Sequence, residues 1–225
     1  MSLTTEFEKR LPAALRQTFQ GLRSPIDVQR YLDSLAYIGE ERDRCPLDVM
    51  KDGQCHCLDG GLFAALALRR LGDPGLLVDL VPLTDANGVK QDDDHVLAVF
   101  RRHDRWGCVA KSNYPWLRYR DPVYRSVREL VMSYFEAYFS ENCRKVLRGY
   151  TKPFDIARCD PLNYAWDEQG AVQLYRRFYA RKAVPLIPPA SEKLLEPADQ
   201  REYDSAFLGI DWRWVYRPGQ TNTEH

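Results

Sequence analysis

The chain has 225 residues, of which 44% are hydrophobic and 28% are charged, a composition typical of a soluble globular protein with one sizeable core. Its 32 basic residues balance 32 acidic ones, which excludes a strong general attraction to nucleic acid or to an anionic membrane. The first residues show no basic start followed by an apolar stretch, and no window approaches about 18 uninterrupted apolar residues. We therefore expect a cytoplasmic protein without a membrane span, with its six cysteines mostly reduced.

The first predicted elements are helices. Residues 5–20 have an amphipathic pattern that Pro12 weakens or splits. Residues 24–38 predict a better helix, because Ser24 can cap it, Pro25 suits its first position, and apolar residues recur at helical spacing.

A longer helix and a buried strand follow. Residues 45–53 predict a short turn of helix. Residues 57–72 have Ala and Leu at helical spacing, two arginines in the last turn, and Gly72 as a stop. Residues 75–83 form an apolar run that predicts a buried strand.

The middle of the chain predicts a β-hairpin and another helix. After a polar loop at 84–94, residues 95–102 and 106–113 read as two strands joined by the tight link His-Asp-Arg. Residues 124–139 predict a strong amphipathic helix with aromatic residues on one side. The order of elements predicts an α+β fold in which an antiparallel sheet packs against helices.

The remainder of the chain has weaker patterns. A helix is expected near 168–181, and the proline-rich residues 183–197 are expected to wrap the surface rather than begin a second domain. We therefore predict a single domain over residues 1–225, with a core at about 24–147, a C-terminal extension at 148–216 and a disordered tail at 217–225.

The stretch DGQCHCLDGGLFAAL, residues 52–66, carries the chemistry-bearing side chains Cys55, His56 and Cys57. A structural zinc site takes a C-x2–4-C pair and a second pair further along the chain. These three residues are consecutive and no second pair follows, so we expect no metal.

Cys57 stands where the helix of residues 57–72 is predicted to begin. The unpaired N–H groups and the dipole of a helix N-terminus stabilise a thiolate, which lowers the pKa of a thiol and makes it a nucleophile. Gly60 and Gly61 indicate close approach of another backbone or a substrate. The alternative is that Cys57 is a small buried hydrophobe at the start of a core helix.

A thiol nucleophile needs an imidazole as its partner. Among the four histidines, His225 lies in the tail, His103 in the hairpin turn, and His56 beside the cysteine but pointing elsewhere. His95 opens a core strand, where a rigid site can be built. It is therefore the predicted general acid.

The residue that orients His95 depends on the hairpin register. A three-residue loop places Asn113 opposite His95, whereas a loop of two or four residues places Ser112 there. Asparagine can accept the imidazole N–H, as in Cys-His-Asn enzymes. The alternative for Asn113 is a turn residue that ends the strand.

Two further residues are candidates for contacts with a substrate. Gln54 could donate a side-chain N–H to an oxyanion. Arg118, with Arg120, could hold a substrate carboxylate or phosphate, although a surface salt bridge is the more ordinary role. Asp92, Asp93 and Asp94 are expected to form a solvated loop rather than a calcium site.

At these positions the sequence resembles the transglutaminase-like superfamily within the papain-like group. Cys57, Asp59 two residues later, the run LFAALALRRLGDP and His95 fit the superfamily pattern in order and spacing. The resemblance spans about residues 24–125, and the run 92–136 resembles a little-characterised bacterial branch. It implies a papain-like core with the nucleophile Cys57 at a helix N-terminus.

The sequence departs from the superfamily pattern in three places. The usual H-A-W is H-V-L at His95, and Leu76 replaces a common arginine. The third catalytic position, an Asp soon after the strand's Trp, falls at residues 111–113 here. Asp121 is a substitute that lies well beyond Trp106.

The predicted activity is amide hydrolysis or acyl transfer through a thioester, with Cys57, His95 and Asn113 as catalytic residues. The predicted substrate is a protein, a peptide or a small amide, with no cofactor, no nucleic acid and no membrane involved. Hydrolysis is favoured because water is always available. The alternatives are a non-catalytic scaffold or partner-binding protein that retains the fold, and a small-molecule acyltransferase of the same Cys-His type.

Overall fold

The computed structural model describes residues 2–219, and its centre is a seven-stranded sheet with the order β6-β5-β4-β3-β7-β9, in which β8 also pairs with β3. Every pairing in this sheet is antiparallel. Its strands are β3 (Leu76–Pro82), β4 (His95–Arg102), β5 (Arg105–Val109), β6 (Arg120–Tyr124), β7 (Leu147–Thr151), β8 (Phe154–Asp155) and β9 (Ala183–Pro185). Two further strands, β1 (Ala36–Tyr37) and β2 (Gln54–Cys55), form a separate parallel pair.

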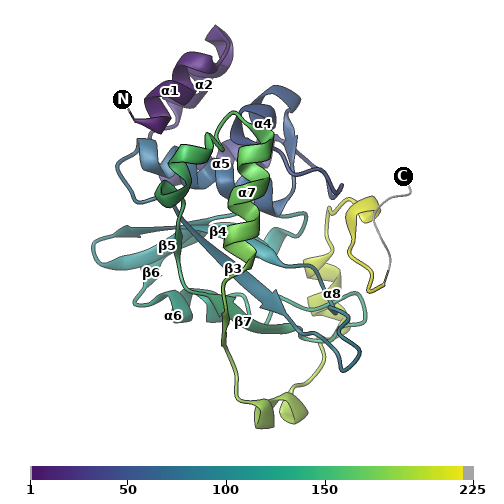
Figure 1. Ribbon diagram of the computed structural model, residues 1–225. Helices are drawn as coiled ribbons and strands as arrows, with labels where there is room; N and C mark the ends of the chain where they lie inside the picture. Colours follow the sequence, from purple (N-terminus) through teal and green to yellow (C-terminus); the bar gives the residue numbers. More distant parts are fainter. Residues whose placement is uncertain (1, 220–225) are drawn as a thin grey trace.

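Helices cover the sheet (Figure 1). They are α1 (Leu3–Arg10), α2 (Ala13–Gly21), α3 (Pro25–Ser34), α4 (Pro46–Asp52), α5 (Cys57–Arg70), α6 (Val127–Met132), α7 (Glu168–Tyr179) and α8 (Gln200–Ala206), with short 3₁₀ helices at Pro115–Leu117, Ile156–Leu162, Pro189–Leu194 and Trp212–Trp214. Helices α1 to α5 and α7 share one apolar core with one face of β3 and β4. Helix α6 and the aromatic residues after it share a second core with the opposite face. The expected antiparallel sheet packed against helices is thus confirmed.

Helix α5 lies unusually close to the sheet because of two glycines. A Cβ placed on Gly60 would lie 2.6 Å from Cβ of Lys111, and one on Gly61 would lie 2.7 Å from Cγ1 of Val96. Real Cβ atoms do not tolerate such contacts. Every residue of α5 from Cys57 to Leu68 is buried. The atoms nearest to both glycines belong to side chains. The sequence had instead suggested that a backbone or a substrate approaches them.

The helix start and stop signals in the N-terminal half are confirmed, but the helix expected over 24–38 is too long, since α3 ends at Ser34 and Ala36–Tyr37 is a strand paired with β2. Pro12 separates α1 from α2. Ser24 caps α3 by accepting a hydrogen bond from the N–H of Asp27, and Pro25 occupies the first helical position. Helix α4 is present as a short helix, and Gly72 has a φ of 91° just beyond α5.

The helix expected over 124–139 is wrong in extent. Helix α6 ends at Met132, and successive turns with hydrogen bonds three residues apart follow it, from Ser133 to Ala137. Tyr134, Phe135 and Tyr138 in these turns are buried against the sheet.

The residues beyond 147 are part of the sheet and of the core. Strand β7 pairs with the central strand β3, β9 pairs with β7, and α7 packs into the first core. Of the tail expected to be disordered, residues 220–225 lie outside the described residues, while Arg217 forms an ion pair with Glu141 at 3.3 Å. Within residues 2–219, no helix has the length and apolar character needed to cross a membrane.

The contact between α5 and the sheet yields a stability prediction. Gly61→Ala should lower the free energy of unfolding by about 1–3 kcal/mol, because the new methyl group overpacks Val96. Urea denaturation measures the change. Gly21→Ala is the matched control, since nothing lies within 4 Å of its Cβ position, and equal loss in both variants would contradict the prediction.

Candidate active site

Cys57 is the first residue of α5, as the sequence predicted. His56 caps the helix, its Nδ1 accepting a hydrogen bond from the N–H of Leu58 at 3.2 Å. The Cys57 side chain is 7% exposed, and its Sγ donates to the backbone carbonyl of Asp94 at 3.5 Å. The thiol therefore lies between the helix N-terminus and the residue that precedes β4.

His95 is the first residue of β4 and is also buried. Its ring meets Tyr134 and Tyr138 edge-on, with centroid distances of 6.3 and 6.5 Å. Its Nε2 lies 2.6 Å from the backbone carbonyl of Leu117. Because a carbonyl only accepts, this contact assigns the proton of a neutral ring to Nε2 and leaves Nδ1 as the basic nitrogen.

Cys57 and His95 line the same small cavity of about 40 Å³. They reach it from opposite faces of the sheet, since His95 packs beside α6 and Cys57 begins the helix on the other face. Within residues 2–219 no hydrogen bond joins the thiol to the imidazole. The structure thus brings the predicted nucleophile and acid to one cavity without a direct bond.

The electrostatic surroundings differ from the thiolate expected from the helix N-terminus. Burial, followed by the negative charge of Asp93, raises the pKa of the Cys57 thiol well above its ordinary value. Burial lowers the pKa of His95 to about 4, against the opposing effect of its bond to Leu117. At neutral pH this structure therefore holds a neutral thiol and a neutral imidazole, not an ion pair.

The hairpin takes the shorter of the loops considered. Arg102 pairs with Arg105, so the turn has two residues, His103 and Asp104, both with positive φ. Continued along both strands, this register places Ser112 opposite His95. The three-residue loop, which would have placed Asn113 there, is therefore wrong. Regular pairing ends at Val109 in any case.

Asn113 lies near the site but makes different contacts from those expected. Its side-chain nitrogen donates to the carbonyl of Asp211, and its side-chain oxygen accepts from the N–H of the same residue, both at 2.9 Å. The backbone carbonyl of Leu117, not Asn113, is therefore the group that holds the His95 ring in this structure.

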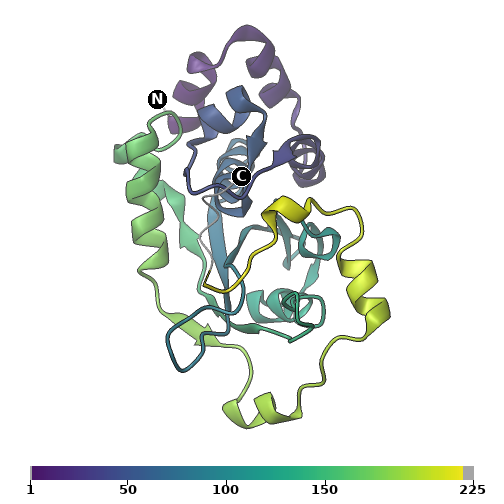
Figure 2. The same cartoon turned by 90° about the vertical axis from the view of Figure 1, so that its right-hand side faces the viewer.

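Asp211 begins a segment, residues 211–216, that we call the C-terminal strap. In Figure 2 the end of the chain crosses the face that is turned toward the viewer. Trp214 and Tyr216 line the small cavity together with Cys57 and His95. The Tyr216 hydroxyl donates to the carbonyl of Lys90 at 3.2 Å, and Val215 is 2% exposed. The strap thus closes one side of the cavity.

The remaining sequence candidates lie at different distances from the cavity. Ser112 lines it, and its hydroxyl accepts from the N–H of Tyr114. Gln54 is half-buried in β2 and lines neither this cavity nor the larger one described below. Arg118 forms an ion pair with Asp33 at 3.2 Å, which is the ordinary role considered for it.

The last alternative, Asp121, is exposed on the edge strand β6. Within residues 2–219, it lines neither the small cavity nor the larger one described next. The geometry gives it no place beside His95.

Cys57 also lines a larger cavity of about 820 Å³, which sequence reasoning did not foresee. Its wall includes Asp79 of β3, whose side chain is 4% exposed. Burial, together with the nearby charge of Asp94, raises the pKa of the Asp79 carboxyl to about 8. In the sequence Asp79 stands inside an apolar run, and a lone acid within a buried strand is the signal that could have marked it.

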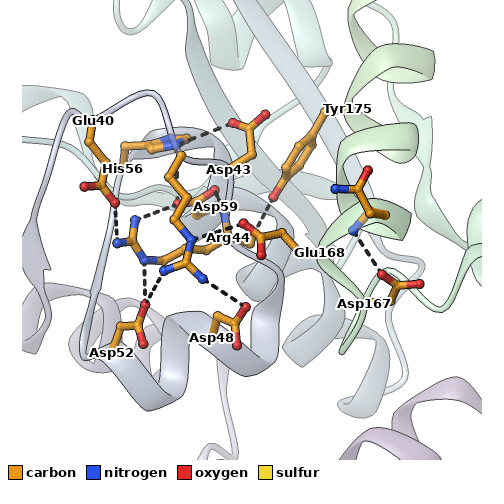
Figure 3. A network of polar contacts seen from close by, with 12 residues as sticks. Glu40, Asp43, Arg44, Asp48, Asp52, His56, Asp59, Asp167, Glu168 and Tyr175 are labelled. Atoms are coloured by element: carbon orange, nitrogen blue, oxygen red, sulfur yellow. Dashed lines mark hydrogen bonds and ion pairs between the residues drawn. The ribbon is translucent and has the colours of Figure 1, made fainter. Parts of the chain in front are cut away.

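Beneath this larger cavity, a polar network fixes the loop before α4 to the start of α5 (Figure 3). Oδ1 of Asp59 accepts from the N–H of Arg44 at 2.9 Å. The guanidinium of Arg44, 2% exposed, donates to Asp52 at 3.0 Å and pairs with Glu40. Asp59, two residues after Cys57, therefore has a structural contact that anchors the helix N-terminus.

One group of described side chains has the spacing of metal ligands. The ligand atoms of Asp43, His56 and Asp59 lie within 4.8 Å of one another. Nε2 of His56 is 3.7 Å from Asp43 and 3.3 Å from Asp59. Arg44, 4.0 Å from the same Asp59 oxygen, already places positive charge there. The six cysteines are all free thiols.

Comparison with protein-family models and with curated protein sequences finds no match. Among solved structures, the chain is similar to Legionella pneumophila LapG with a TM-score of 0.34 and 11% identity, over 48% of this chain and 70% of that one. The EGTA-treated LapG structure gives a TM-score of 0.34 and 12% identity, over 49% and 68%. A likeness this distant carries no weight for the site, which rests on its own geometry.

The hydrogen bonds of Asn113 to Asp211 predict that the C-terminal strap opens more readily when this side chain is removed. Asn113→Ala removes both side-chain hydrogen bonds to Asp211. If the free energy of opening of the strap falls by about 1.4 kcal/mol, the backbone amides of residues 211–216 should exchange with deuterium at least tenfold faster. Asn87→Ala, in an exposed loop, is the control. Unchanged exchange in the Asn113 variant would show that the strap is held by other contacts.

The buried carboxyl of Asp79 predicts a pH-dependent stability. An unfolded Asp has a pKa of about 3.9, so with a folded pKa of about 8 the folded state binds more protons between these values. Stability is then lost as the pH rises, by up to about 1.4 kcal/mol per pH unit. Asp79→Asn should make the fall from pH 5 to pH 7.5 shallower in urea denaturation. Asp121→Asn should leave the slope unchanged, and identical slopes in all three proteins would refute the assignment.

Proposed function

We propose that the chain is a cysteine-dependent amide hydrolase or acyl transferase, with Cys57 as the nucleophile and His95 as its base and acid. The observation that supports this proposal most strongly is the position of the Cys57 thiol. It stands at the first residue of a buried helix, opens to a cavity of about 820 Å³, and shares a second cavity with His95.

The proposed reaction begins with two neutral groups. Nδ1 of His95, left basic by the bond from Nε2 to Leu117, takes the proton of the Cys57 thiol as Sγ attacks the amide carbonyl. The tetrahedral intermediate carries an oxyanion, which the dipole of α5 stabilises. The protonated His95 then gives its proton to the leaving amine, and a thioester remains on Cys57.

The thioester is released by water or by an amine. In either case His95 takes a proton from the attacking group and returns it to the Cys57 sulfur. This proposal covers a peptidase, an amidase and a transglutaminase-like enzyme, which differ only in the acceptor. The substrate enters from the larger cavity, since the small one has room for only about one or two water molecules.

The proposed roles of the thiol and imidazole predict how Cys57 reacts with iodoacetamide. The alkylation rate should keep rising above pH 8, because burial raises the pKa of the thiol. At pH 7, His95→Ala should slow alkylation at least tenfold by removing the base. Peptide mass spectrometry reads the modification at Cys57 separately from the other cysteines.

The matched control is His103→Asn, since His103 lies in the hairpin turn with a positive φ that Asn tolerates. A rate at Cys57 that is equal in wild type and His95→Ala would overturn the proposed pair. A plateau of the rate at pH 5–7 would instead show an ion pair in the reacting state.

The raised pKa of the thiol supports one other candidate, a non-catalytic scaffold or partner-binding protein that keeps Cys57 as a buried core residue. Incubation of dimethylcasein with a biotinylated pentylamine separates the two. An enzyme yields new amino termini, released ammonia or incorporated amine, and Cys57→Ala abolishes all three. A scaffold yields none of them.

A further inference from the structure

Asp79 lies on the face of the sheet that α5 covers. It pairs with Val96 in the register of β3 and β4, and directly paired residues share one face of a sheet. The Val96 side chain is the one that Gly61 of α5 approaches. Asp79 thus lies below the N-terminal turn of α5, where Cys57 begins the helix.

The Asp79 carboxylate is buried without a compensating bond. Oδ1 has no hydrogen-bond partner among residues 2–219, although the side chain is only 4% exposed. The backbone N–H of the same residue is satisfied by Oγ1 of Thr151 at 3.0 Å. Since buried polar groups are almost always paired, an orphan oxygen in a cavity wall calls for a partner that arrives from outside.

The surrounding cavity has an excess of negative charge. Its wall contains six acidic residues, Glu40, Glu41, Asp43, Asp79, Asp93 and Asp94, against three basic ones, Lys90, Arg176 and Arg181. Lys90 already forms an ion pair with Asp94. The aromatic rings of Tyr37, Tyr175 and Tyr179 complete the wall, and aromatic faces attract organic cations.

A metal ion fits this part of the cavity less well. Asp43, His56 and Asp59 form the group with metal-ligand spacing among the described residues, and Asp79 is not in it. An ammonium or guanidinium group on a flexible stem has the reach and the donors that an isolated carboxylate needs.

We propose that Asp79 is a specificity residue that binds the cationic side-chain group, ammonium or guanidinium, of an amide substrate whose carbonyl is presented to Cys57. This inference rests on the proposed function of Cys57. A buried acid in the pocket beside a nucleophile is a known physical basis for selecting basic side chains.

Binding of a cation is linked to the protonation of Asp79. Burial raises its pKa to about 8, so at pH 7 most of the carboxyl is protonated, and binding a cation releases that proton. The affinity of the protein for the cation should therefore increase about tenfold between pH 7 and pH 9. The charged or titratable groups that face Asp79 are Asp93, Asp94 and Lys90 of the loop before β4, Cys57 of α5, Tyr138 of the turns after α6 and Tyr179 of α7.

The test is calorimetric titration of the full chain with butylammonium and with butylguanidinium, with neutral butanol as the comparison. We expect one bound cation per chain, no comparable binding of butanol, and release of a proton at pH 7, measured in two buffers of different ionisation enthalpy. Whichever cation binds more tightly identifies lysine or arginine as the source of the side chain.

Asp79→Asn should weaken cation binding at least tenfold and abolish its increase with pH. Glu41→Gln removes one charge from the exposed part of the same wall and should change affinity less than threefold. Equal losses in the two variants, equal binding of butanol, or cation binding without proton release in the wild type would overturn the proposal.

The two proposals can fail separately. The probes contain no amide, so Cys57→Ala should bind the cations as tightly as the wild type. Cation binding with an unreactive Cys57 would refute the catalytic proposal alone. A reactive Cys57 without cation binding would refute the role of Asp79 alone.

Discussion

The close packing of α5 on the sheet determines the geometry of the whole site. Gly60 and Gly61 allow the first turn of the helix to approach Lys111 and Val96 at distances that a Cβ would forbid. Lys111 in turn donates to the carbonyls of Leu32 and Leu35 at the end of α3, so a buried ammonium fixes a second helix to the same contact. The helix N-terminus is thereby set beside the start of β4, and Cys57 has little freedom to lie elsewhere.

This tight packing also explains why the thiol is neutral. Burial removes most of the water that would solvate a thiolate, and the acidic groups nearby, Asp93, Asp79 and Asp94, disfavour a second negative charge. The helix dipole acts in the opposite direction, but its contribution is smaller than the loss of solvation at this buried position. In the proposed reaction, removal of the thiol proton is therefore coupled to attack, and this makes a basic imidazole nitrogen in the same cavity more important than the helix position alone.

Sequence reasoning succeeds where the signals are local. Ser24 and Pro25 mark the start of α3, and the small residues after Cys57 predict α5, because capping and periodicity act within a few residues.

Sequence reasoning fails where distant segments decide the structure. The pattern at 124–139 is helical throughout, yet Tyr124 belongs to β6, which pairs with β5, and α6 covers only Val127–Met132. A single residue in the turn shifts the hairpin register, and with it the placement of Asn113. Strands β7 and β9 are short and pair with segments far along the chain, so no local pattern defined them. Asp79 gave no sign of its neighbours, because an acid in an apolar run does not show which helix covers it.

The contacts of Asn113 change the interpretation of the C-terminal extension. A residue expected to orient the imidazole instead holds the backbone of Asp211, and the strap that follows places Trp214 and Tyr216 in the wall shared by Cys57 and His95. Strand β7, from the same extension, pairs with β3 and supports Asp79 through the hydroxyl of Thr151. Both sides of the thiol, the small cavity and the large one, therefore depend on residues beyond the segment in which the sequence resemblance lies. A fragment that ended near residue 147 would keep Cys57 and His95 but would lose the wall that excludes water from the imidazole and the strand that positions the buried acid.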